Sequence, residues 1–523
     1  MKIGKKVFVS YNIVILFIVA VSIGSCQNKN VVETTVNVET SIVEETEESV
    51  IDLAEIIEER TFENITYEKD LNGNEYTTVK LANNEKKKVV YDALMLDEYY
   101  DIDASIEVDI GDENSVSGEF KNYVRFVDGD IELMAGSIYV LKGELNGGQI
   151  RIIGNAGERV QIVLDGVNIN TSKEFAICSP FECMVLIRLN DNTENHISYL
   201  DLEEDSKKKK NTKPKKMEAA ILVNSSLTFT GKGVLDIGGS FKNAIECGDA
   251  LTFISGNYII NGTDDGIKGN VCVIIKNGSF NINVEADAIK AMNDIRGFIF
   301  IERSEMNIDS YGKGVSAPKE LIFAGGNIHI DSKKECIEGK TVDIINGNYD
   351  LKSGADCIKA YNIKDINNLS GVYVRLAGGI INIDSWFDGI DSNGNLYFEG
   401  ADVNISGPTR HAEKIINYNG NVYLEKGDII ALGASKEVKN LGYDPVQNYI
   451  IVYYNNARPK GSAYQVVDEA DNVLMSFTPA KDYRVAILSS NKLKIGQTYN
   501  LISMDDVNKV TIMGKITISD FRK

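Results

Sequence analysis

The chain has 523 residues, with 45 glycines, only 7 prolines and a formal net charge of −21. A chain this acidic is not expected to bind nucleic acid, because the phosphate backbone attracts basic surfaces. Three widely separated histidines and the lack of any CxxC pair argue against a zinc site and against Ser-His-Asp or Cys-His catalysis.

The first 26 residues have the pattern of a bacterial lipoprotein signal peptide. Lys2, Lys5 and Lys6 precede an apolar run from Val7 to Ile23, and small residues then lead to Cys26. This pattern predicts lipidation of Cys26 and anchoring of the protein to the membrane at the extracellular face of the cell. A retained transmembrane helix is the alternative interpretation, since the length of the run suits both.

Residues 27–62 are rich in Glu, Thr and Val and contain few large apolar side chains. Such a segment cannot bury enough surface to offset the entropy of ordering it. It is therefore predicted to be a disordered acidic tether, followed by an N-terminal β region over residues 63–108.

A motif of about 22 residues then repeats along the centre of the chain, with successive steps of 22, 22, 26, 22, 21 and 32 residues. Its copies begin at Asn243, Asp265, Asp287, Lys313, Glu335, Asp356 and Asp388. Half a repeat away, apolar pairs at i and i+2 shift in step with the motif. They are Tyr258/Ile260, Phe280/Ile282, Met306/Ile308, Ile328/Ile330, Tyr349/Leu351, Ile381/Ile383 and Val403/Ile405.

Apolar pairs at i and i+2 indicate strands, because both side chains lie on one face. Gly256, Gly278, Gly326, Gly347 and Gly379 precede the pairs, where tight turns need positive φ. The repeat therefore predicts an all-β parallel β-helix with three strands per coil. A leucine-rich repeat has a similar length, but its leucine frame is absent.

The β-helix is expected to occupy residues 109–432. Longer strands after this point predict a small C-terminal β cap over residues 433–523, which would cover the open edge of the last coil. The lysine-rich stretch 207–216 is interpreted as a solvated loop insertion, with contact to a wall polymer as the alternative.

Stacked coils lie about 4.8 Å apart, so equivalent residues form ladders. Carboxylates at this spacing repel one another unless a cation neutralises them, and calcium prefers flexible oxygen ligands. The candidate calcium ligands are Asp264, Asp265, Asp287, Asp356, Asp388 and Asp391. The alternative for each is an aspartate that forms a turn by hydrogen bonding to its own backbone.

Three lysines, Lys268, Lys290 and Lys359, occupy the fourth motif position and are expected to point outward. They are candidates for binding sugar carboxylates. The alternative is that they form weak ion pairs on a solvated face. Trp386 lies in a turn, where it could stack on a sugar ring or pack against the next coil. Cys336 and Cys357 share a motif position, which predicts a buried ladder of thiols rather than a disulfide.

Several of these segments resemble a clostridial family of carbohydrate-binding, calcium-dependent β-helix proteins that are similar to polysaccharide lyases. The segments are Val163–Ile169, Asp265–Lys268, Trp386–Gly394 and Phe477–Tyr483, within a region of about residues 105–505. The resemblance implies a right-handed parallel β-helix, calcium in Asp-lined turns, and binding of cellulose and acidic pectin-like glycans. The copies at Lys313 and Glu335 lack the Asp-Gly pair, which interrupts the expected calcium ladder.

Three functions are consistent with these features. The first is binding of polysaccharide at the cell surface, with no catalytic residues. The second is a calcium-dependent polysaccharide lyase acting on uronates, in which a lysine such as Lys268 or Lys290 would abstract a ring proton. The third is a purely structural or adhesive surface protein.

Overall fold

The computed structural model describes residues 64–69, 75–91, 102–111, 115–116, 122–199, 218–239, 241–410, 412–434, 437–442, 445–505 and 509–519. All of them belong to one compact unit, Phe62–Lys523. The signal peptide, Cys26, the tether and the lysine-rich stretch 207–216 lie outside the described residues. Within the described ranges, no helix has the length and apolar character needed to cross a membrane.

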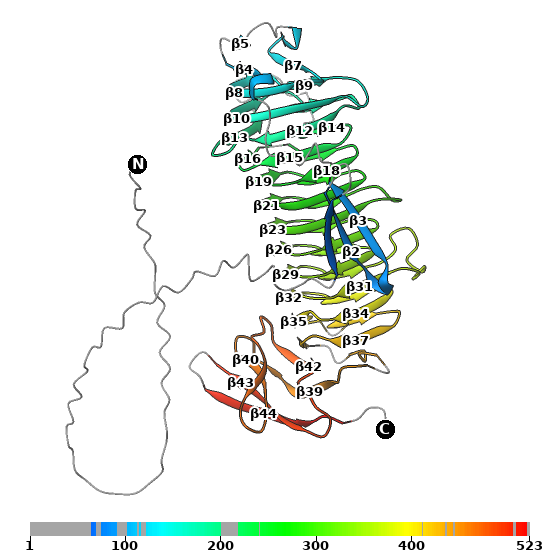
Figure 1. Ribbon diagram of the computed structural model, residues 1–523. Helices are drawn as coiled ribbons and strands as arrows, with labels where there is room; N and C mark the ends of the chain where they lie inside the picture. The colour runs from blue at the N-terminus through cyan, green and yellow to red at the C-terminus, as the bar shows by residue number, and fades with distance from the viewer. Residues whose placement is uncertain are drawn as a thin grey trace, which may run out of the picture. The chain divides into compact units, whose positions relative to one another are not determined.

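The unit is an all-β parallel β-solenoid of about 11 turns, with about 24 residues per turn (Figure 1). This confirms the predicted fold class. The spacing of 22 residues is the length of a coil without insertions. Extra residues at the corners, such as those between β30 (Ile358–Ala360) and β31 (Tyr373–Leu376), raise the average.

Each central coil contributes one strand to each of three walls. The first wall contains β12 (Met184–Leu189), β15 (Leu227–Gly231), β18 (Ala250–Phe253), β25 (Glu320–Phe323), β28 (Thr341–Ile344), β31, β34 (Asn395–Glu399) and β37 (Val422–Lys426). The second wall contains β13 (Glu194–Tyr199), β16 (Val234–Ile237), β19 (Asn257–Gly262), β26 (Asn327–Ser332), β29 (Asn348–Ser353), β32 (Ile380–Ser385), β35 (Asp402–Ser406) and β38 (Ile429–Gly433).

Some strands are long enough to run through both of these walls. They are β8 (Ile138–Gly147), β10 (Arg159–Thr171), β21 (Cys272–Val284) and β23 (Phe298–Ser310). Upstream, β4 (Ile106–Ile110) pairs in parallel with β8 and antiparallel with β5 (Ser115–Val116). A short 3-10 helix, η2 (Ile102–Ala104), precedes β4.

The third wall is a sheet of 13 strands that contains every copy of the repeated motif. Its strands are β6 (Val124–Val127), β7 (Asp130–Met134), β9 (Ile150–Ile153), β11 (Ile177–Ser179), β14 (Ala219–Val223), β17 (Asn243–Cys247), β20 (Ile267–Gly269), β22 (Ile289–Ala291), β24 (Val315–Ser316), β27 (Ile337–Gly339), β30, β33 (Ile390–Ser392) and β36 (Ile416–Tyr418). All neighbours in it are parallel except the antiparallel pair β6–β7.

The core is a continuous ladder of side chains inside the coils. All seven predicted apolar pairs are buried, and aromatic rings stack between coils, with 4.7 Å between the centroids of Tyr258 and Phe280. The five glycines predicted at the turns have φ between 85° and 136°. Cys336 and Cys357 are buried free thiols, as predicted.

An N-terminal antiparallel sheet covers the outer face of the first wall. It consists of β1 (Ile65–Lys69), β2 (Glu75–Lys80) and β3 (Lys86–Tyr91), with a 3-10 turn, η1 (Ala82–Asn84), between β2 and β3. Its apolar side chains, including Val79 and Val89, join one cluster with Ile274, Phe300 and Ile322 of the solenoid. Figure 1 shows β2 and β3 lying across the first-wall strands.

The C-terminal region covers the last coil. Strand β42 (Tyr483–Ser489) pairs antiparallel with β38 and with β39 (Tyr449–Arg458), which ends the parallel stacking. A separate antiparallel sheet follows, in the order β41 (Val473–Phe477), β40 (Ala463–Val467), β43 (Thr498–Met504) and β44 (Val510–Thr517). Its apolar side chains form a second core together with residues of β38, β39 and β42.

Candidate functional site

The acidic residues that begin the motif copies bind backbone groups of the next coil. Asp265 accepts a hydrogen bond from the backbone N–H of Asp287 at 3.1 Å. Asp287 accepts one from Lys313 at 2.9 Å, and Asp356 accepts one from Asp388 at 3.0 Å. These aspartates therefore stabilise the stacking of coils. The turn-forming alternative expected hydrogen bonds from each aspartate to its own backbone, whereas these hydrogen bonds run between coils.

The motif lysines pair with these carboxylates. The Nζ atom of Lys290 lies 3.0 Å from Asp287 and 3.6 Å from Asp265. The Nζ atom of Lys359 lies 2.6 Å from Asp356 and 3.8 Å from Asp391. The lysines and their carboxylate partners form an ion ladder along the third wall. Its members are Glu246, Asp265, Lys268, Asp287, Lys290, Glu335, Asp356, Lys359, Asp388 and Asp391.

The pKa shifts of the aspartates differ from coil to coil along the ion ladder. Burial alone would raise the pKa of Asp287, but the Lys313 N–H and the Lys290 ammonium lower it. Burial and repulsion from neighbouring carboxylates raise the pKa of Asp388 to about 7 and that of Asp391 to about 6. Negative charge is therefore poorly compensated around Asp388 and Asp391.

The candidate calcium ligands can be compared with what a metal ion needs. Within the described ranges, no group of three or more His, Cys, Asp or Glu side chains is arranged to hold a metal ion. Asp264 is exposed, whereas Asp265 beside it is buried and paired with lysine. Between Asp356 and Asp391, the Lys359 ammonium occupies the place that a cation would take.

Trp386 lies in the turn between β32 and β33 and is 50% exposed. The Nζ atom of Lys481, from the C-terminal cap, lies 5.3 Å from its ring centroid. Lys481 also pairs with Asp384 and donates a hydrogen bond to the Ser385 carbonyl at 2.8 Å. One ring face is therefore near a cation, and half of the side chain is accessible to a ligand.

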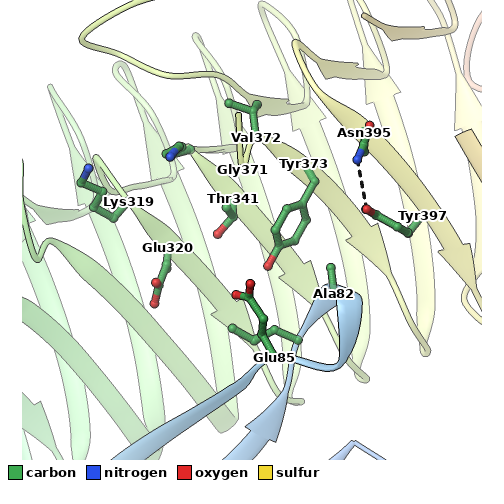
Figure 2. Close-up of a pocket in the computed structure, with 12 residues that line it drawn as sticks. Ala82, Glu85, Lys319, Glu320, Thr341, Gly371, Val372, Tyr373, Asn395 and Tyr397 are labelled. Atoms are coloured by element: carbon green, nitrogen blue, oxygen red, sulfur yellow. Dashed lines mark hydrogen bonds between the residues drawn. The ribbon is translucent and has the colours of Figure 1, made fainter. Parts of the chain in front are cut away.

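A pocket that the sequence interpretation missed lies at the N-terminal ends of the first-wall strands β25, β28, β31 and β34, against the turn between β2 and β3. Tyr373 and Tyr397 line it together with Ala82 and Glu85 from that turn (Figure 2). The sequence did contain a signal that the outer face of the first wall is covered. Cys272–Ile275 and Phe298–Ile301 are continuous apolar runs, which are typical of strands buried on both faces.

Comparisons with known proteins match the solenoid part of the chain. The sequence pattern of a family described as "Carbohydrate-binding domain-containing protein" matches residues 127–336 and 319–439. A protein of the same description from Acetivibrio thermocellus is 27% identical over 161 residues, which are 31% of this chain and 54% of that protein. The chain thus matches about half the length of this relative.

One solved structure is also similar, a polysaccharide lyase-like protein from C. thermocellum that was studied as a gadolinium derivative. It has 24% sequence identity and a TM-score of 0.36, with 48% of this chain and 90% of that chain covered. The family matches together extend over residues 127–439, which is more than half of the chain and most of the solenoid. The chain belongs to the family of carbohydrate-binding domain-containing proteins.

Proposed function

We propose that this protein binds polysaccharide along its solenoid. The observation that carries the proposal is the family match, which lies on the solenoid rather than on the terminal regions. A stack of coils suits a polymer ligand because equivalent side chains recur about every 4.8 Å along one wall. Lysines, carboxylates and exposed aromatic rings on such a wall offer repeated contacts to successive sugars.

We further propose that the glycan is an acidic, pectin-like polymer, with cellulose as the neutral alternative. Lysine ammonium groups bind carboxylates through charge-assisted hydrogen bonds, which are stronger than those between neutral groups. Apolar sugar faces can stack on rings such as Trp386, which is half exposed. The net charge of −21 opposes an acidic polymer at long range, so its binding needs local positive charge or bridging cations.

Calcium is a separate proposal, at Asp356, Asp388 and Asp391, whose side chains are not arranged as a metal site in this structure and would have to rearrange on binding. The raised pKa values of Asp388 and Asp391 indicate that a cation would relieve repulsion there. Since Lys359 lies between these carboxylates, calcium binding would require its ammonium to move away. The calcium-dependent change in melting temperature should disappear in the double variant Asp388→Asn/Asp391→Asn.

We also propose that the protein is held at the extracellular face of the cell membrane through a lipid on Cys26. The support is the pattern of the first 26 residues, with its basic start, apolar run and small residues before the cysteine. Metabolic labelling with a fatty acid, compared between the natural chain and Cys26→Ser, tests it. Equal labelling of both proteins would count against the lipid anchor.

The binding proposal is tested with the full chain, using immobilised polygalacturonate and cellulose, each in calcium and in chelator. Retention on polygalacturonate that chelator abolishes supports calcium-bridged binding of an acidic glycan. Retention on neither material in calcium leaves a structural or adhesive role as the better account. Appearance of unsaturated uronate ends in solution, followed by their ultraviolet absorbance, would instead indicate a lyase.

A further inference from the structure

The pocket beneath the N-terminal sheet has the volume of a small ligand site. Its volume is about 310 Å³, which is at the lower end of the roughly 300–1,000 Å³ of small-molecule pockets. One side is formed by Leu81, Ala82 and Glu85, and the other by residues between Lys319 and Tyr397, more than 230 residues later in the sequence. Only the folded chain brings these two segments together.

Two lysines in the pocket differ from those of the ion ladder. Lys319 and Lys340 occupy equivalent positions one coil apart, immediately before β25 and β28. Both are half-buried, and neither forms an ion pair with any residue in the part of the chain that the structure describes. These two ammonium groups are therefore available to an anionic ligand.

A buried hydroxyl also lacks a protein partner. Thr341 is 8% exposed and lines the pocket. Its Oγ1 atom makes no hydrogen bond of ordinary geometry within the described residues, although it lies near enough to the Tyr373 hydroxyl to affect the pKa of that group. The Tyr373 hydroxyl itself donates to Asp343 at 2.8 Å. A buried hydroxyl without a partner is costly, and a sugar hydroxyl would satisfy it.

Aromatic rings form the floor next to these polar groups. Tyr373 packs edge-on against Tyr397, which stacks on Tyr423 with 4.7 Å between centroids. The Tyr397 hydroxyl accepts a hydrogen bond from the Asn395 side chain at 3.1 Å, as Figure 2 shows. Tyr423 is 42% exposed at the next coil, so the aromatic surface continues from the pocket to the outside.

The N-terminal side of the pocket is held firmly in place. The Nζ atom of Lys87 lies 2.6 Å from Glu320, and Arg375 donates to the Lys80 carbonyl at 2.9 Å. Glu85 rises from the turn toward Tyr373 and Thr341 (Figure 2). The charged residues of the lining are two lysines (Lys319 and Lys340) and two carboxylates (Glu85 and Glu320), and Glu320 is paired with Lys87 outside the lining.

We propose that this pocket is a subsite for one negatively charged sugar residue of the bound polysaccharide. The carboxylate of the sugar lies between Lys319 and Lys340, its ring contacts Tyr373 and Tyr397, and one hydroxyl pairs with Thr341. The proposal rests on the proposed function and goes beyond it, because it assigns the N-terminal sheet a direct part in recognition. The ion ladder, whose lysines are already paired, is a different surface.

The test is calorimetric titration of the full chain with oligogalacturonate and with its neutral methyl ester. The double variant Lys319→Gln/Lys340→Gln should bind oligogalacturonate about tenfold or more weakly, because it loses charge-assisted hydrogen bonds. Its affinity for the ester should be unchanged. The matched control is Lys232→Gln/Lys494→Gln, which removes the same charge from two exposed lysines elsewhere and should bind like the natural chain.

The outcomes separate this subsite from the proposed function. If the natural chain and the pocket variant bind oligogalacturonate equally, the subsite is wrong and polysaccharide binding stands. If the control variant loses as much affinity, long-range charge explains the effect and the subsite is again wrong. If the natural chain binds no polysaccharide, the proposed function fails and the subsite fails with it. The single variants, checked by thermal melting, exclude misfolding as the cause.

Discussion

At the residue scale, aspartates at the same motif position have pKa values shifted in opposite directions in different coils. Asp287 and Asp388 both begin a motif copy, are both buried and both accept a backbone N–H from the following coil. Asp287 has Lys290 at 3.0 Å, whereas the surroundings of Asp388 include Asp356, Asp391 and Glu413. The same residue type is therefore stabilising as an anion in one coil and destabilising in another.

This contrast predicts opposite effects of two isosteric changes. The pKa of Asp388 rises from 3.8 to about 7 on folding, so its ionisation lowers stability as pH increases over that interval. Asp388→Asn should therefore raise the free energy of unfolding at about pH 8 by an amount on the order of 1 kcal/mol, which raises the melting temperature, and should change both little at about pH 4. Thermal melts in chelator across this range measure the effect.

Asp287→Asn is the matched control, with the opposite sign. The folded-state pKa of Asp287 is lowered, so its contribution to stability is present above 3.8 and is lost as pH falls through the folded value. The variant should melt below the natural protein at about pH 8 and approach it at low pH. If both variants shift the melt in the same direction at about pH 8, this electrostatic account is wrong.

At the element scale, the first wall shows how one sheet stabilises another. Arg375 is fully buried, with its guanidinium Nε 2.7 Å from Glu399 and its Nη1 hydrogen bonded to the Lys80 carbonyl. It also pairs with Asp343 at 3.4 Å, and burial raises the pKa of Asp343 to about 7. A single arginine thus connects three coils with the N-terminal sheet.

Arg375→Met should loosen the N-terminal sheet. The change leaves Asp343 buried without its cation and removes the hydrogen bond to β2, a loss of about 3–5 kcal/mol for a broken buried pair. Backbone hydrogen exchange over Ile65–Lys69 and Lys86–Tyr91 should accelerate by at least about tenfold. Adding Asp343→Asn should recover part of the protection, because it removes the unpaired charge. Unchanged exchange in Arg375→Met would show that apolar contacts alone hold the sheet.

At the scale of the whole molecule, a solenoid has only two ends, and each exposes a strand edge. Strand β42 covers β38 in antiparallel pairing, and Lys481 binds Asp384 and Ser385 on the neighbouring turn. Because each coil contacts only its neighbours, a bare terminal coil can pair with another molecule. The C-terminal region therefore protects the solenoid from end-to-end association.

A chain that stops after Gly433 should associate through β38. Light scattering after size-exclusion chromatography should show species larger than a monomer, or the protein should precipitate. Lys481→Ala in the full chain is the control, because it weakens a contact of the cap and keeps β42 in place. A truncated chain that stays folded and monomeric would show that the cap is dispensable.

Much of the fold followed from local patterns. Pairs such as Tyr258/Ile260 face inward because strand side chains alternate, and Gly256 precedes them because the turn has positive φ. The period of the motif predicted the length of one coil. The shared motif position of Cys336 and Cys357 predicted that both thiols are buried. These features depend on neighbours within one coil or on the same position in the next, which a repeating sequence displays directly.

Other features were decided only by the tertiary structure. Which oxygen of Asp265 meets a backbone N–H, and which meets Lys290, depends on side-chain geometry across coils. The pocket depends on Glu85 approaching strands more than 200 residues away, and no period relates these segments. The sequence by itself determined the solenoid, because its stabilising contacts repeat. The covered wall and the pocket arise from contacts that occur once, so only the folded chain decides them.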